Sequence, residues 1–219
     1  MPETIYFLRH GETAWNAERR MQGQAESDLN ARGRAQAEVN AETAARLGVE
    51  AIYASPLRRT RQSAAPLARR TGLEIVYDDR LKEWSAGDWS GYLYDEIPAK
   101  WPAAWAAWRA DMWRTRPPGA ENFEDLLARG GAFLRELTAT ECQSAAVVSH
   151  GFISRAMMAS LAGLAPEDAL RLKTANDVLF RFRRAGEKWT ADRFEAGAGP
   201  MPGLFEGDLN NTAGPARPA

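Results

Sequence analysis

Short apolar runs and longer amphipathic stretches alternate along the chain. Five runs are short and apolar enough to be buried strands: 5–8, 51–54, 75–77, 145–148 and 178–182. Helical spacing of apolar residues is found in most of the stretches between them. Because alternating strands and helices build a parallel sheet covered on both faces, the pattern predicts an α/β protein. We expect a three-layer αβα sandwich with a mostly parallel central sheet.

Capping residues and stop signals define the helices. Asn30 is a suitable N-cap for a helix that stops at Gly48. Three more helices are expected over about 56–70, 122–140 and 151–161. The strand that begins at 178 and a further one over 189–194 flank the sequence RAGEK, which indicates a hairpin.

Two segments differ from this alternation. Residues 92–118 contain four of the eight tryptophans, three of them with helical spacing over 101–108. We expect a helical cap insertion there, whose tryptophan face packs on the body of the domain or, alternatively, adds one or two rings to a substrate pocket. The segment 195–219 is rich in glycine and proline, so we expect a tail after a single domain over 1–194.

The composition narrows the classes of partner. Lys and Arg number 28 and Asp and Glu 29, so a net charge of -1 gives no reason to expect nucleic acid or an anionic membrane. No run of about 20 apolar residues is present, and the start of the chain does not resemble a signal peptide. The single cysteine, Cys142, allows no intrachain disulfide. We therefore expect a cytoplasmic protein.

Three of the predicted strands end in residues that can do chemistry. The first strand runs into Arg9 and His10, and the fourth runs into His150. These are the two histidines of the chain, and each is followed by glycine. The second strand leads to the pair Arg58 and Arg59. One histidine at a strand end is usually a satisfied polar residue, but two with an arginine pair at one sheet edge indicate a ligand site.

This set of residues suits a phosphate ester. Arginine supplies charge and directional donors for phosphate oxygens. An imidazole whose Nδ1 proton is held by a backbone carbonyl keeps Nε2 free to attack phosphorus. A carboxylic acid is also needed to protonate an alkoxide leaving group. Two distant histidines and one cysteine disfavour a zinc enzyme, which normally needs about three protein ligands.

Four sequence blocks connect these residues to a known family. FLRHGETAWN, SPLRRTRQSA, LKEWSAGDWSG and VVSHG resemble the blocks of the histidine phosphatase superfamily, also called the phosphoglycerate mutase-like family. The resemblance covers residues 4–194, with the blocks in the expected order and spacing. It implies an enzyme that forms a phosphohistidine intermediate and uses neither a metal nor an organic cofactor.

The resemblance also implies a role for each matching residue. His10 would be the phosphorylated nucleophile, and Arg9 and Arg59 would hold the phosphate. His150 would donate to the phosphoryl group, and Glu83 would protonate the leaving group and then activate water. Four further positions match residues that line the phosphate pocket or its entrance: Thr13, Asn16, Gln22 and Gly23.

Within the family, the sequence favours a phosphatase acting on a small phosphorylated metabolite. Glu83 is followed by WSAGDWSG, a pattern common in phosphatases, instead of the tyrosine–glycine pair of cofactor-dependent phosphoglycerate mutases. A mutase is the alternative. A non-catalytic phosphate-binding module is a second alternative, although such members lack some of the residues present here. The identity of the metabolite is left open, as is a homodimer, which is frequent among relatives.

Overall fold

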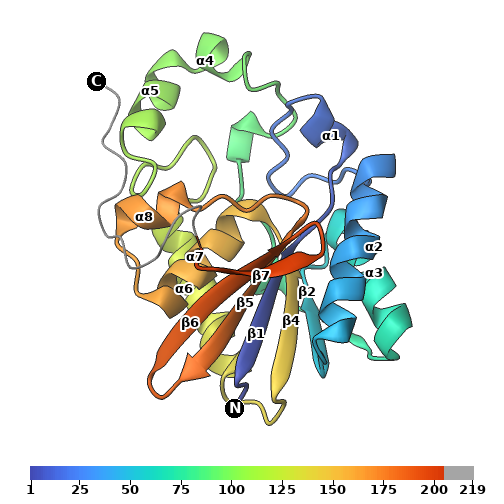
Figure 1. Ribbon diagram of the computed structural model, residues 1–219. Helices are drawn as coiled ribbons and strands as arrows, with labels where there is room; N and C mark the ends of the chain where they lie inside the picture. The colour runs from blue at the N-terminus through green and yellow to red at the C-terminus, as the bar shows by residue number, and fades with distance from the viewer. Residues whose placement is uncertain (205–219) are drawn as a thin grey trace.

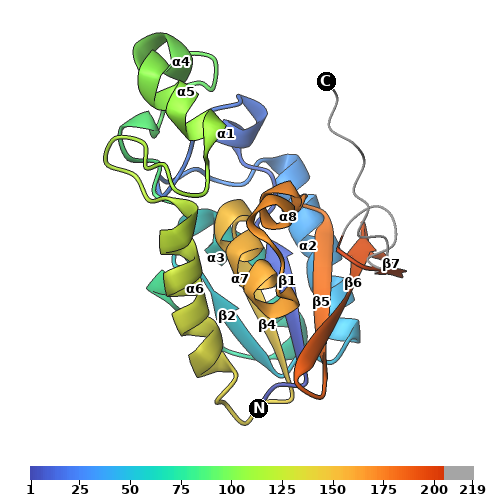
Figure 2. The same ribbon diagram turned by 90° about the vertical axis from the view of Figure 1, so that its left-hand side faces the viewer.

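The computed structural model describes residues 1–204 and contains a seven-stranded sheet with helices on both faces (Figures 1 and 2). The strands are β1 (Thr4–Arg9), β2 (Ala51–Ala54), β3 (Ile75–Tyr77), β4 (Ser144–Ser149), β5 (Val178–Ala185), β6 (Lys188–Glu195) and β7 (Ala198–Pro202). Their order in the sheet is β3-β2-β4-β1-β5-β6-β7. The first four are parallel to one another, and the last three are antiparallel to their neighbours. The predicted α/β class is confirmed, with the parallel half of the sheet on the side of β1 to β4.

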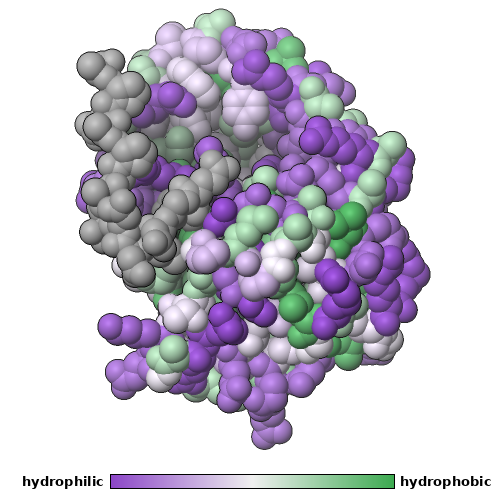
Figure 3. Space-filling view, viewed as in Figure 1, coloured by the Kyte–Doolittle hydropathy of each residue, from purple (hydrophilic) through white to green (hydrophobic). Residues whose placement is uncertain are grey.

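The helices form the outer layers. On one face lie α2 (Ala31–Arg46) and α3 (Arg58–Thr71), and on the other lie α6 (Phe123–Leu137) and α7 (Gly151–Ala162). The sheet has a hydrophobic core on each of its two faces. The alternation of side chains along β1 contributes to both cores, since successive side chains of a strand point to opposite faces. Tyr6 and Leu8 pack with α2 and α3, whereas Ile5 and Phe7 pack with α6 and α7. The outward face of α2 and α3 is charged, and hydrophilic residues gather over these helices in Figure 3.

Asparagine side chains cap the starts of two helices, at Asn30 as predicted and also at Asn122. The side chain of Asn30 accepts a hydrogen bond from Gly33 N (2.8 Å), and that of Asn122 accepts one from Asp125 N (3.0 Å). Gly48, with φ +76°, follows the end of α2. Short elements with weak patterns were not predicted: α1 (Ala14–Ala17), η1 (Asp79–Leu81), η2 (Gly87–Trp89) and α8 (Pro166–Arg171).

The cap inserted at 92–118 consists of α4 (Ile97–Lys100), α5 (Pro102–Ala110) and the loops around them, and lies above the carboxyl ends of the parallel strands (Figure 1). Trp108 is 5% exposed, and its ring stacks on Trp84 with 5.7 Å between centroids. Both Trp105 and Trp108 also contact Trp89. The tryptophan face of the cap therefore packs on the body of the domain, as in the first of the two interpretations.

The segment predicted as a tail begins with a strand. β7 pairs antiparallel with β6, and Leu204 is 3% exposed. Gly197, with φ +82°, supplies the backbone conformation that the tight turn between the two strands requires. The glycines and prolines of this segment hide the strand pattern, so the strand at 198–202 was not predicted from the sequence. The rest of the predicted tail, 205–219, lies outside the described residues.

Across residues 1–204, none of the helices combines the length and the apolar character that crossing a lipid bilayer requires.

Candidate active site

The ends of β1, β4 and β2 meet at one edge of the sheet. The backbone N–H of His10 donates to Ser149 O (3.0 Å), and that of Ser55 donates to Val148 O (3.1 Å). These bonds continue the strand pairing beyond the strand ends. As a result the rings of His10 and His150 lie side by side, with centroids 5.2 Å apart and an angle of 61° between the planes.

His10 has the tautomer that a nucleophile needs. Its Nδ1 donates to the carbonyl oxygen of Gly11 (2.7 Å), so Nε2 carries the free lone pair. Burial lowers the pKa of His10 well below its ordinary value of 6.5, and the charges of Arg59 and Arg9 act in the same direction. The imidazole is therefore neutral at neutral pH.

The backbone after His10 is held by a close approach to α2. A Cβ on Gly11 would overlap the carbonyl oxygen of Gly33, the third residue of α2. The N–H of Gly11 also donates to Ser63 Oγ (3.1 Å), which lies in α3. The glycine after the histidine is thus required by packing, and it fixes the position of the imidazole.

Arg59 links His150 to the loop that follows α1. It is 1% exposed and donates from Nη1 to Ala25 O and from Nη2 to Gly23 O, both at 2.7 Å. Burial lowers its pKa to about 10, so it remains a cation. Its Nε donates to Nδ1 of His150 (3.2 Å). Since a guanidinium cannot accept, Nδ1 is the acceptor and Nε2 of His150 donates to Ser55 Oγ (2.8 Å).

The pKa of His150 is also held well below 6.5, first by burial and then by the charge of Arg59. This histidine is therefore neutral as well, with its one accepting nitrogen directed at Arg59.

Arg9 and Glu83 lie close together beside Gly151. A Cβ on Gly151 would be 3.5 Å from Glu83 Oε2 and 3.8 Å from Arg9 Cζ. Arg9 donates from Nη1 to Thr174 O (2.7 Å), while its buried Nε has no partner among residues 1–204. A Cβ at position 151 would thus be in ordinary van der Waals contact with both the carboxylate and the guanidinium.

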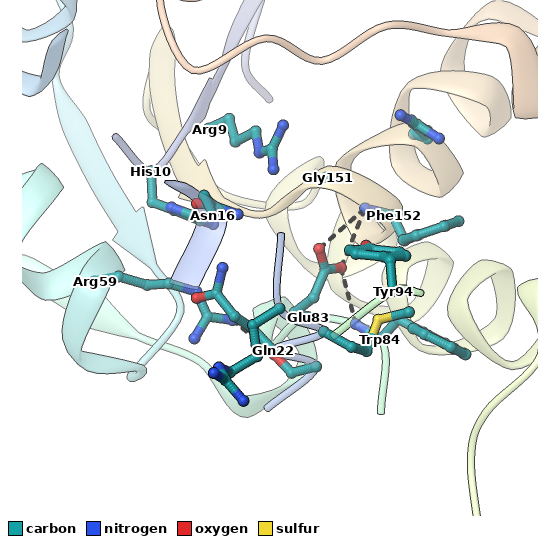
Figure 4. A pocket seen from close by; sticks show the side chains of 14 residues that line it. Arg9, His10, Asn16, Gln22, Arg59, Glu83, Trp84, Tyr94, Gly151 and Phe152 are labelled. Carbon is teal, nitrogen blue, oxygen red and sulfur yellow. Dashed lines mark hydrogen bonds between the residues drawn. The ribbon is translucent and has the colours of Figure 1, made fainter. Parts of the chain in front are cut away.

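The carboxylate of Glu83 sits at the N-terminus of α7 (Figure 4). Oε1 accepts from the backbone N–H groups of Trp84 (2.8 Å), Phe152 (3.1 Å) and Ile153 (3.3 Å). Free N–H groups at a helix start favour an acidic side chain. The carboxylate is thus oriented by backbone donors on the cavity wall.

Arg129 of α6 is hydrogen-bonded to the backbone of the loop that contains Glu83. It donates to the carbonyl oxygens of Arg80 and Lys82 (2.7 Å each) and of Glu83 (3.0 Å). An ion pair of 2.8 Å with Glu121 holds the guanidinium in place. These bonds fix the backbone beneath the carboxylate.

These side chains line one cavity of about 260 Å³ (Figure 4). Most site residues predicted from the sequence face it: Arg9, His10, Asn16, Gln22, Gly23, Arg59 and Glu83. His150 lies behind them, in contact with His10 and Arg59. Thr13 is fully buried at the N-cap of α1, where its N–H and hydroxyl both contact Asn16 Oδ1 at 3.1 Å. Thr13 therefore orients Asn16 from beneath.

Sequence reasoning missed several cavity residues: Arg20, Met21, Trp84, Tyr94, Gly151, Phe152 and Arg155. Three of them adjoin predicted residues, so adjacency was a usable signal. Tyr94 comes from the cap. Arg155 had a signal of its own, because it is the one charged residue of α7, GFISRAMMASLA. In the part of the chain that the structure describes, no group of three or more His, Cys, Asp or Glu side chains is arranged to hold a metal ion.

The fold and the site define a class of protein, an α/β protein with a buried, neutral histidine and two arginines at the carboxyl edge of its sheet. The family model of the histidine phosphatase superfamily (branch 1) matches residues 5–197, and the chain belongs to this family.

Known members of the family are similar over most of the chain. Glucosyl-3-phosphoglycerate phosphatase of Mycobacterium tuberculosis is 37% identical over 167 residues, which cover 72% of this chain and 74% of that protein. Phosphoserine phosphatase 1 of Hydrogenobacter thermophilus is 34% identical over 161 residues, covering 73% and 76%. A solved structure of a mycobacterial glucosyl-3-phosphoglycerate phosphatase with VO3 gives a TM-score of 0.79 at 34% identity, covering 87% of this chain and 97% of that one.

Proposed function

We propose that this protein is a metal-independent phosphomonoester phosphatase, which acts on a small phosphorylated metabolite through a phosphohistidine intermediate. The observation that carries the proposal is the neutral His10, with Nε2 free, in a cavity shared with Arg9, Arg59 and Glu83. Membership of the histidine phosphatase superfamily supports it, as do the two relatives, which are both named as phosphatases.

In the first half-reaction, Nε2 of His10 attacks phosphorus, and the bond from phosphorus to the ester oxygen breaks. Arg9 and Arg59 offset the negative charge of the phosphoryl oxygens. Glu83, in its protonated form, gives its proton to the departing oxygen and becomes a carboxylate. The products are a phosphohistidine and an alcohol.

In the second half-reaction, the Glu83 carboxylate takes a proton from water, and the water oxygen attacks phosphorus. The bond from phosphorus to Nε2 breaks, which releases phosphate and restores neutral His10 and protonated Glu83. His150 assists through Nδ1, which accepts from Arg59 in this structure. Burial and then the arginine charges lower the pKa of His150, and a bound dianion offsets the arginine charges. This favours a protonated His150, whose Nδ1 then donates to a phosphate oxygen instead of accepting from Arg59.

The entrance to the cavity supplies further polar groups. Asn16 and Gln22 both line the cavity, and the buried Oε1 of Gln22 has no hydrogen-bond partner among residues 1–204. Gly23 lines the cavity with φ +54°, and a Cβ there would lie 2.8 Å from Ala86, so the backbone can pack against Ala86 in this conformation only as glycine. We assign these residues, with Thr13 beneath Asn16, to substrate binding.

We further propose that the partner is the phosphomonoester alone, without nucleic acid or membrane, and that the protein acts in the cytoplasm. The balanced charge of the chain and its single cysteine support this placement. A homodimer is the oligomeric state to test first.

The test is phosphate release from a panel of phosphomonoesters in the presence of EDTA, with sugar phosphates, 3-phosphoglycerate and phosphoserine in the panel. His10→Ala should abolish both turnover and the acid-labile phosphoenzyme. The exposed Arg135→Ala on α6 is the matched surface control and should keep both. Turnover retained by His10→Ala would overturn the proposal. Interconversion of 2- and 3-phosphoglycerate with added bisphosphoglycerate, without phosphate release, would identify the mutase, and binding of phosphate without either reaction would identify the binding module.

A further inference from the structure

One cation of the cavity has no partner in the protein. Arg155 lines the cavity from α7 and forms no hydrogen bond or ion pair with any of residues 1–204. Its Nε is buried, and its guanidinium lies over the ring of Phe152, with Cζ 5.2 Å from the centroid. Buried arginines are normally paired, because an unpaired buried donor is unfavourable. The cavity therefore offers a fixed donor fork without a protein acceptor.

The other arginines that line the cavity are already bonded. Arg9 and Arg59 each donate to backbone carbonyls at 2.7 Å. Arg20 forms an ion pair of 2.9 Å with Glu18. Among the described residues, Arg155 is thus the cavity arginine that has no acceptor in the protein.

Arg155 lies on the side of the cavity where the leaving group must sit. Glu83, the proton donor of the proposed function, bonds to the N–H of Phe152 at the start of α7. Arg155 follows Phe152 by three residues, which places the two on the same face of the helix. The leaving oxygen must approach Glu83, whereas the phosphate lies toward His10. An acceptor for Arg155 must therefore belong to the leaving group.

The charges of the cavity agree with this placement. When Glu83 is protonated to act as the acid, Arg9, Arg59 and Arg155 bring three positive charges that no acidic side chain of the cavity offsets. A phosphate monoester brings about two negative charges at neutral pH. One positive charge is left over, and a carboxylate on the leaving group would neutralise it through the bidentate geometry that guanidinium and carboxylate share.

We propose that Arg155 binds a carboxylate of the leaving group, so that the substrates of this protein are phosphate esters of small hydroxy acids. The proposal rests on the proposed function and narrows its substrate class. Arg155 is then a residue that determines specificity, in contact with a part of the substrate that does not react.

Two pairs of esters isolate the carboxylate. Phosphoserine and phosphoethanolamine differ only by this group, and in glycerol 3-phosphate a hydroxymethyl replaces the carboxylate of 3-phosphoglycerate. The measurement is the ratio of kcat/KM within each pair, for the wild type, Arg155→Gln and Arg155→Lys. Arg20→Gln is the matched control, since it removes a cavity arginine that already has an acid partner.

The wild type should prefer the carboxylated ester of each pair. Arg155→Gln should lower the ratio by about tenfold to a hundredfold, the range of a charge-assisted hydrogen bond. Arg155→Lys, which keeps the charge but loses the fork, should give an intermediate ratio, and Arg20→Gln should keep the wild-type ratio. Turnover of p-nitrophenyl phosphate by each variant verifies that the site is folded. If Arg155→Gln does not fold, the ratio measured for Arg155→Lys is compared with that of the wild type instead.

A wild type without preference would overturn the inference, and so would a ratio that both Arg155 variants leave unchanged or an equal fall in Arg20→Gln. Each of these outcomes leaves phosphate release, and with it the proposed function, intact. Absence of phosphate release from every ester would instead be a failure of the proposed function.

Discussion

The two histidines make the stability of this fold sensitive to mild acid. Both are buried, and the pKa of each is held well below 6.5, by burial first and then by the charge of Arg59. In the unfolded chain each has an ordinary pKa of about 6.5. Below that pH the unfolded state therefore binds two protons that the folded state does not bind. The contribution of the two neutral histidines to the free energy of unfolding is therefore present in full above the pKa of the unfolded chain. It is lost as the pH falls from there toward the lower pKa values of the folded state.

The size of the effect follows from the unfolded state alone, as long as the folded histidines stay neutral. For one unfolded histidine, the quantity that enters the free energy is one plus the ratio of its protonated to its neutral form. Between pH 7.5 and 5.5 this quantity rises about tenfold, which corresponds to about 1.4 kcal/mol. For His10 and His150 together, the free energy of unfolding should fall by about 2.7 kcal/mol. The carboxylates of Asp78 and Asp125, whose pKa values are lowered by Arg80 and Arg116, contribute only near and below the unfolded pKa of about 3.9.

Urea unfolding, followed by tryptophan fluorescence in buffers without phosphate, measures this loss. His10→Asn and His150→Asn should each halve the difference between pH 7.5 and 5.5, whatever their effect on stability at pH 7.5. The double variant should remove it. A wild-type stability that is constant over this range, or a loss that persists in the double variant, would refute the reasoning.

Four other variants test the site and its support. Glu83→Gln should lower kcat on alkyl phosphates by about 10²–10⁴, but far less on p-nitrophenyl phosphate, whose leaving group needs little protonation; equal losses in steady-state assays would count against Glu83 as the acid. Arg129→Gln removes the donors that hold the Glu83 loop, so kcat on alkyl phosphates should fall more than on p-nitrophenyl phosphate, and an effect on KM alone would contradict this positioning role. Gly11→Ala should destabilise the fold by about 2–4 kcal/mol, because its Cβ would overlap Gly33. Gly131→Ala, in α6, should stabilise the fold by up to about 1 kcal/mol, because its Cβ would meet only the Arg135 side chain, at an ordinary 3.5 Å. If urea unfolding gave a change of the same sign for both glycine variants, the packing at Gly11 would not be decisive.

Local signals allowed much of this fold to be predicted. The apolar runs define the strands to within a few residues, and Asn30 marks the start of α2 with its own side chain. The convergence of His10 and His150 was predictable because neighbouring parallel strands end at the same edge. Each of these features depends on a few consecutive residues and on a general rule of chain geometry.

Features that depend on long-range packing were not predicted. Tyr94 reaches the cavity because the cap folds over this edge of the sheet, and no spacing in the sequence indicates that. The single charge of Arg155 in the apolar α7 is a signal in the sequence, but it does not show that the side chain lines the cavity. Thr13 belongs to a motif shared with the family, but its hydroxyl is used to cap α1. In the antiparallel half of the sheet, β7 was not predicted, because its glycine and prolines mask the alternation of apolar and polar residues that is typical of a strand.

The nucleophile and the acid of the proposed reaction are supported by opposite sides of the molecule. His10 is positioned by backbone contacts with α2 and α3, through Gly11. Glu83 is positioned by α6 and α7, and the leaving-group side of the cavity is completed by side chains such as Tyr94 and Arg155. Substitutions of Tyr94 or Arg155 can change which ester fits while Gly11 keeps its contacts with α2 and α3. Substrate choice can therefore vary while phosphoryl transfer to His10 stays the same, which is why the leaving-group side is the place to look for the substrate of this chain.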